Sequence, residues 1–153
     1  MDQPLFSSVI GWQLKSLMAD QLTATLQKGA WTYTMAEPVL GFQARGDERQ
    51  SLFWKLSWFE TDEGDDTLRI TATSDVDEIP YYLRIEGFTD PCVIASTIQL
   101  EGAIIREVNG NGFHYQEEAH LTALVFHTSI GYVTIETGSG GLMTVSIADI
   151  VET

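Results

Sequence analysis

The sequence predicts an α+β fold that is mainly β, in which one N-terminal amphipathic helix packs on a strongly curved antiparallel sheet or partly closed barrel. Apolar residues recur every four positions over about residues 9–28, which is the spacing of one helical face. From about residue 31 to residue 151 apolar and polar residues alternate, with hairpin-length connections between the alternating segments. No second long helical segment is available for a parallel crossover, so the sheet is expected to be antiparallel.

The length and charge of the chain limit its class and its partners. Its 153 residues fit a single domain spanning 1–153, since domains cluster at roughly 100–150 residues. Eight basic and 22 acidic residues give a net charge of −14, and the basic residues are scattered along the chain. Because such a field repels phosphates and anionic lipid surfaces, we expect neither direct nucleic-acid binding nor membrane binding.

The cellular location is predicted from what the sequence lacks. No apolar run approaches the ~20 residues of a membrane helix, and the first eight residues do not resemble a secretory signal. The single cysteine, Cys92, cannot form an internal disulfide, whereas small secreted domains usually carry several. These features favour a cytoplasmic protein.

The helix predicted over about residues 9–28 rests on one apolar stripe. The stripe consists of Ile10, Leu14, Met18, Leu22 and Leu26. Its opposite face lacks the lysine and arginine of a membrane-surface helix, so the stripe is expected to pack against the sheet of the same domain.

The strands are predicted from alternation between polar connections. The segments are 31–35, a hairpin of 52–59 with 67–73, 81–86, 97–108, 121–127, 132–137 and 143–148. The alternation slips near Gly102, which indicates a bulge or sharp bend there. Asn109-Gly110-Asn111-Gly112 predicts a tight turn, because asparagine and glycine tolerate positive φ.

An acidic connection is the first candidate for a binding site. Within seven residues the hairpin tip carries five carboxylates, at Glu60, Asp62, Glu63, Asp65 and Asp66. The spacing lacks the calcium-loop pattern, so a solvated hairpin tip is favoured over a metal loop. The five carboxylates are also candidates for contact with a basic partner.

The histidines supply only a weak metal candidate. The densest cluster of ligand types is His114, Glu117, Glu118 and His120. Neither an HExxH motif nor a CxxC pair accompanies it, and we expect no metal and no cofactor. No nucleophile elbow, phosphate loop or other catalytic motif is present, which favours a protein that is not an enzyme.

Aromatic residues on predicted strands form the remaining candidate surface. Trp54 and Trp58 share one strand face, and Tyr81 and Tyr82 begin another strand. Such residues build a core, line a pocket or form an interface, and the sequence leaves these three roles open.

The leading hypothesis is therefore a non-enzymatic interaction module that acts through its aromatic sheet surface or its acidic loops. Its partner would be a basic protein or a second copy of the same chain. The alternative is a small-molecule binder or enzyme with an aromatic-lined pocket inside the curved sheet. Ten of the 22 carboxylates fall in three predicted connections, five at 60–66, three at 75–78 and two at 117–118. This acidity becomes evidence for function if the loops gather on one side of the fold.

Overall fold

The computed structural model describes residues 3–20, 22–27, 30–138 and 141–149, and within them the chain is mainly antiparallel β. One helix is present in these residues, α1 (Gln3–Ser7), together with the short 3-10 turn η1 (Val76–Glu78). The strands are β1 (Gln13–Ala19), β2 (Leu22–Gln27), β3 (Ala30–Ala36), β4 (Val39–Ala44), β5 (Asp47–Glu60), β6 (Asp66–Thr73), β7 (Tyr82–Leu83), β8 (Cys92–Val93), β9 (Ser96–Gln99), β10 (Ile105–Tyr115), β11 (Glu118–Thr128), β12 (Gly131–Thr137) and β13 (Leu142–Asp149). The end of the predicted strand region, 150–151, lies outside the described residues.

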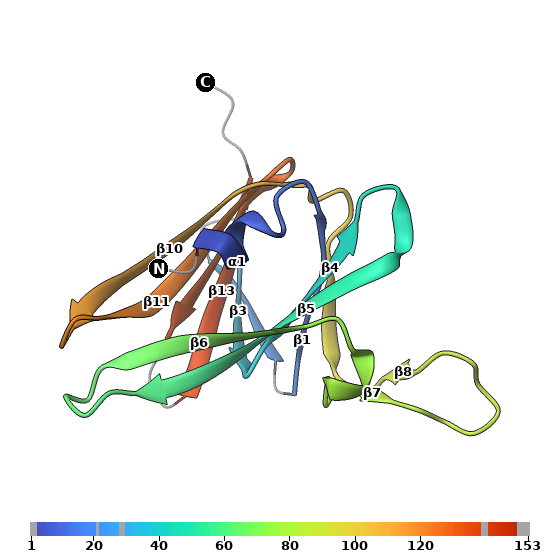
Figure 1. Cartoon of the computed structure of the whole chain (residues 1–153), viewed down its shortest axis with the longest axis horizontal. Helices are drawn as coiled ribbons and strands as arrows, with labels where there is room; N and C mark the ends of the chain where they lie inside the picture. Colours follow the sequence, from blue (N-terminus) through green and yellow to red (C-terminus); the bar gives the residue numbers. More distant parts are fainter. Residues whose placement is uncertain (1–2, 21, 28–29, 139–140, 150–153) are drawn as a thin grey trace.

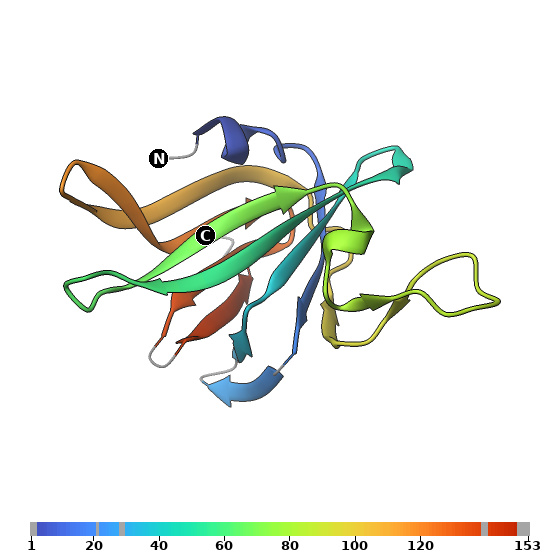
Figure 2. The same ribbon diagram turned by 60° about the horizontal axis from the view of Figure 1, so that its bottom comes forward.

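The long strands form one strongly curved sheet that nearly closes on itself (Figures 1 and 2). Its order is β2-β3-β13-β12-β11-β6-β5-β4-β1-β9, and β10 pairs with the other edge of β11. The start of β10 returns to β1 through a bridge between Gln13 and Ile104 and a 2.9 Å hydrogen bond from the Leu14 amide to the Ala103 carbonyl. The predicted antiparallel, barrel-like sheet is thus confirmed, whereas the α part of the predicted α+β class is reduced to one short helix.

The helix predicted over residues 9–28 is wrong, because β1 and β2 occupy most of that segment. A bulge between Leu14 and Ser16 adds one residue to β1, so that Leu14 and Leu17 both face the main core. Met18 faces the opposite side of the sheet, where a second apolar cluster covers it. A bulged strand that is buried on both faces therefore reproduces the spacing of a helical stripe.

The interior of the sheet is an aromatic core. Trp54 is fully buried, and its ring lies 4.8 Å from that of Phe42 and 5.8 Å from that of Phe126. Helix α1 covers one end of this cluster, where Phe6 packs 6.2 Å from Trp54. The Trp54 indole nitrogen has no hydrogen-bond partner within the part of the chain that the structure describes.

A flap covers part of the outer face of the sheet. It comprises η1, β7, β8 and their connections, and Figures 1 and 2 show it projecting from one end of the molecule. Ile79 and Tyr81 anchor the flap against Met18, Val39 and Phe53. Of the predicted strand over 81–86, only Tyr82–Leu83 is formed, and it pairs with β8 rather than with the main sheet.

The turn predicted at residues 109–112 is also wrong. β10 runs through these residues, with a register shift between Asn111 and Gly112. The chain turns instead at Gln116 and Glu117, whose φ angles are 52° and 67°. Gly112 serves close packing, since a Cβ atom there would lie 1.8 Å from the carbonyl oxygen of His120.

Candidate functional site

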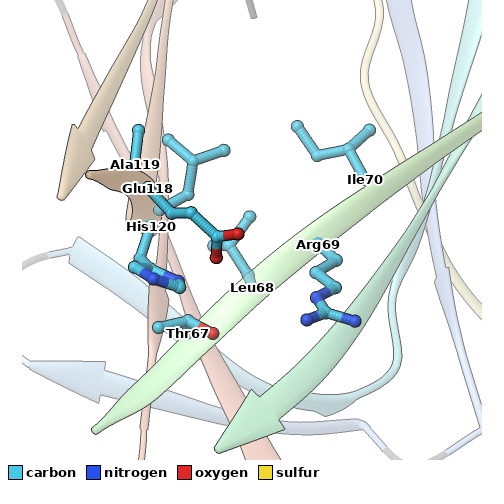
Figure 3. Close-up of a pocket in the computed structure, with 8 residues that line it drawn as sticks. Thr67, Leu68, Arg69, Ile70, Glu118, Ala119 and His120 are labelled. Carbon is cyan, nitrogen blue, oxygen red and sulfur yellow. The ribbon is translucent and has the colours of Figure 1, made fainter. Parts of the chain in front are cut away.

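A cleft of about 510 Å³ separates β6 from the start of β11, and Figure 3 shows its lining. Residues 67–70 form one wall and residues 118–121 form the other. Only one register pair, Leu68 with Leu121, joins the two strands within the described residues. The cleft thus lies where the pairing between these two neighbouring strands stops.

The wall formed by β6 presents backbone groups to the cleft. At the hairpin tip the Thr61 amide donates to the Asp65 carbonyl at 2.9 Å. This bond determines which residue pairs of the β5–β6 ladder are hydrogen-bonded to each other. Hydrogen-bonded and non-hydrogen-bonded pairs alternate in an antiparallel ladder. The amides and carbonyls of Leu68, Ile70 and Ala72 must therefore point away from β5 and toward the cleft.

The wall formed by β11 presents its backbone in the same way. A two-residue turn with positive φ at both positions closes on a hydrogen-bonded pair, here Tyr115 with Glu118. Ala119 and Leu121 are one and three residues beyond Glu118, so the alternation leaves their amides and carbonyls facing away from β10. Ala119 has no register partner on the β6 side, so two partly unpaired strand edges face each other across the cleft.

Acidic loops lie beside this cleft. The Tyr115 hydroxyl on the β10–β11 hairpin donates a 2.7 Å hydrogen bond to Glu63 on the β5–β6 hairpin. This bond is the main reason that the pKa of Tyr115 is raised, and the charges of Asp62 and Asp65 raise it further. Figures 1 and 2 show both hairpins at the same end of the molecule. The carboxylates of residues 60–66 therefore gather with Glu117 and Glu118.

The third acidic connection lies elsewhere. Residues 75–78 belong to the flap, at the opposite end of the molecule in Figure 1. There Asp77 forms a 2.6 Å ion pair with Arg84, and Asp75 accepts a hydrogen bond from the Asp77 amide. Seven of the ten loop carboxylates thus gather near the cleft, and three do not.

The side chains around the cleft are mixed in charge. Figure 3 places Glu118 and His120 on one wall and Arg69 on the other. His120 stacks on Phe113 with ring centroids 5.4 Å apart, and the Arg69 guanidinium lies 3.6 Å from the centre of the Phe59 ring. No ion pair joins Arg69 to Glu118 among the described residues, so both charges remain available to a bound segment.

The four residues of the metal candidate are not brought together. Phe113 pairs with His120 and Tyr115 pairs with Glu118, which places His120 and Glu118 on one face of the hairpin. His114 pairs with Ala119 on the other face, because neighbouring pairs alternate. The described residues contain no group of three or more histidine, cysteine or acidic side chains that could hold a metal ion.

The aromatic candidates have separate roles. Trp54 belongs to the core, and Trp58 is half-buried and donates a 3.0 Å hydrogen bond to the Asp66 carboxylate. The buried Tyr81 donates to the Glu37 carbonyl at 2.9 Å, while Tyr82 packs edge-on against Phe53. None of the four lines the cleft, so the aromatic sheet face and the acidic loops are distinct features.

Sequence reasoning missed Arg69, Ile70 and Ala119 as parts of a site. Arg69 and Ile70 fall in the predicted strand 67–73 and Ala119 falls just before the predicted strand 121–127, but a gap between two strands distant in sequence leaves no local signal. The sequence singles out the acidic loops beside the cleft, and of the lining itself it singles out Glu118 and His120, although for a metal site.

Comparisons with known proteins give no further guide to function. No family model matches the chain, and neither the curated proteins nor the solved structures contain a significant match. Across the described residues, no helix has the length and apolar character needed to span a membrane.

Proposed function

We propose that the protein is a non-enzymatic binding module that takes an extended, basic segment of a partner protein into the cleft between β6 and β11. One observation supports this most directly. Two partly unpaired strand edges face each other across a cleft with a volume of about 510 Å³. Strand addition to such an edge supplies main-chain hydrogen bonds that do not depend on the partner's side chains.

The dimensions suit a short segment. Residues Arg69–Ala72 follow Leu68, the one β6 residue that pairs with β11, and have no partner on that side among the described residues. These four strand residues extend about 13 Å, which limits the length of segment that can pair with them. Ile70 and Leu121 offer apolar contact, so a segment with alternating apolar and basic residues fits the walls. Its basic side chains would meet the carboxylates of residues 60–66 and of Glu117 and Glu118.

Charge supplies the preference for a basic partner. The net charge of −14 attracts cationic proteins from a distance, and the acidic loops concentrate that field at one end. Rim charges act mainly on the association rate and are screened by salt. Binding is thus expected to weaken as ionic strength rises, while a contribution from backbone pairing remains.

Calorimetric titration with defined peptides tests this proposal. The probe is a blocked seven-residue peptide of alternating lysine and valine. Two matched controls replace every lysine with glutamate or methylate alternate backbone amides. We expect saturable binding of the first peptide, at least tenfold weaker binding of the methylated peptide and no binding of the acidic one.

Charge variants locate the interaction. Asp62→Asn with Asp65→Asn should weaken the lysine peptide about threefold to tenfold, in line with about 1 kcal/mol for exposed ion pairs. The matched control, Asp75→Asn with Asp77→Asn, removes the same charge from the flap and should have little effect. Equal losses from both pairs, or binding that tolerates backbone methylation, would refute strand addition in this cleft.

The structure offers less support for the alternative of a pocket inside the sheet. Trp54, Phe42 and Phe126 pack directly on one another there, and the cleft between β6 and β11 lies outside them. Self-association remains a prediction, which sedimentation at several protein concentrations would test.

A further inference from the structure

A second hollow, of about 240 Å³, lies on the outer face of the sheet beneath the flap. Its floor comes from β1, β4, β5 and β9, and Tyr82 and Val93 of the flap complete its wall. It is separate from the cleft between β6 and β11, and the two share no lining residue.

Two features of the backbone create this hollow. Gly41 pairs with Ser16 and Phe53 on the neighbouring strands, and a Cβ atom at Gly41 would lie 3.7 Å from the Phe53 ring and in collision with the Ser16 hydroxyl. The missing side chain therefore lets the Ser16 hydroxyl and the Phe53 ring lie close to the backbone of β4 at the floor of the hollow. The bulge in β1 places Lys15 beside Ser16 among the residues that line the hollow.

The lining combines an apolar surface with polar groups that have no protein partner. Met18, Phe53 and Tyr82 provide the apolar part. The Ser16 and Ser51 side chains make no hydrogen bond to any described residue, and Lys15 makes no ion pair there. Convergent polar groups on an otherwise apolar lining are typical of small-molecule sites.

The flap is suited to admit a ligand. Its two strands have only two residues each, Tyr82–Leu83 and Cys92–Val93. Over the hollow, the Tyr82 ring meets the Phe53 ring edge-on with centroids 5.7 Å apart. A segment held by so few backbone pairs opens at low cost compared with the main sheet.

We infer that this hollow binds a small aromatic monocarboxylate. The ring would lie against Phe53 and Tyr82 on the apolar side of the hollow, and the carboxylate would meet the Lys15 ammonium and the Ser16 hydroxyl. A volume of about 240 Å³ is below the ~300 Å³ at which ligand pockets usually begin, so the ligand has a single ring. The cation selects an acid over the corresponding alcohol, and the aromatic pair selects a flat apolar body.

Titrations followed by amide NMR test the inference, with benzoate as the probe and benzyl alcohol as the uncharged control. Benzoate is expected to shift the amide signals of Ser16, Gly41, Phe53 and Val93 saturably, and benzyl alcohol is expected to bind about fivefold more weakly. Lys15→Gln should abolish this preference. The matched variant Arg106→Gln removes an exposed cation outside the lining and should keep it.

A variant that fills the hollow distinguishes binding inside it from a general effect of charge on benzoate. Ser51→Leu places an apolar side chain in the hollow and should weaken both probes at least tenfold. An unchanged fold is verified by the amide spectrum away from the flap. The inference is overturned if benzoate gives no saturable shifts at these residues, if benzyl alcohol binds equally well, or if Ser51→Leu leaves benzoate binding intact.

Discussion

Gly112→Ala is expected to destabilise the hairpin that forms one wall of the cleft. The new Cβ atom would lie 1.8 Å from the His120 carbonyl oxygen, which belongs to the backbone of the partner strand. Because such a contact needs about 3.0 Å, β10 and β11 must separate locally by about 1.2 Å (3.0 − 1.8). A hydrogen bond of about 2.9 Å lengthened by that amount is no longer a hydrogen bond.

The magnitude follows from the pairs beside this contact. Phe113 and His120 form the adjacent pair, and its two backbone hydrogen bonds contribute about 1 kcal/mol each. Forcing an atom into a packed region costs about 1–3 kcal/mol in addition. The free energy of unfolding should therefore fall by about 3–5 kcal/mol, which corresponds to a Tm lower by roughly 10 °C for a chain of this size.

Urea denaturation and amide hydrogen exchange measure these effects. Asn111→Ala, at the neighbouring exposed position, is the control and should stay within about 0.5 kcal/mol of the parent. If the distal hairpin opens locally instead, exchange at Phe113 and His120 will rise to the rate of an unprotected amide. A Gly112→Ala variant with unchanged stability and unchanged protection at both residues would refute the reasoning.

Three further predictions concern the core and the flap. Ile79→Ala removes a buried anchor of the flap, and it should lower the free energy of unfolding by about 2–4 kcal/mol in urea and speed exchange at Val93. Trp54→Phe removes the buried indole N–H that has no described partner, so calorimetry should show a smaller loss than the ~3–5 kcal/mol expected for Phe126→Ala. Burial raises the pKa of Tyr82 above the ordinary 10.0. The contribution of the protonated Tyr82 to stability is therefore complete below pH 10 and is lost as the pH rises through the pKa of the folded state. In denaturation measured over a series of alkaline pH values, Tyr82→Phe should make the decline in stability less steep.

The sequence predicts that the sheet is antiparallel and curved, but it does not predict every strand correctly. Period-two alternation identifies β5, β6, β12 and β13, because the β5–β6 and β12–β13 pairs run without a register shift. It fails at β1, where the bulge at Lys15 and burial on both faces produce a helical spacing. Periodicity reports which residues are buried, and it cannot separate a doubly covered, bulged strand from a helix.

The tight-turn prediction failed for a related reason. The glycines and asparagines at 109–112 predict a turn because they tolerate positive φ, whereas Gly112 is required for the close approach of the His120 carbonyl. The actual turn uses Gln116 and Glu117, which are poor candidates by composition but complete a two-residue connection. Tertiary contact decided which glycines turn the chain and which admit a neighbouring strand.

The candidate site could be predicted only in its charge. The acidic loops were visible as runs of carboxylates, but their gathering depends on a contact between Tyr115 and Glu63, which are 52 positions apart. The cleft itself depends on where the β6–β11 ladder stops, after the pair of Leu68 and Leu121. Neither contact follows from any local pattern.

The break in the ladder also bears on why the cleft exists. Continuing the pairing of Leu68 with Leu121 would bring Ile70 opposite Ala119 and add hydrogen bonds of about 1 kcal/mol each. The fold forgoes this stabilisation between two strands whose other edges are paired along most of their length, β6 with β5 and β11 with β10. Departures from local consistency in natural proteins concentrate at functional or strained sites. The unpaired edges also lie beside seven clustered carboxylates, which discourage pairing with a second acidic copy and favour a basic strand. The same arrangement would therefore account for both the open edge and the selectivity that we propose for it.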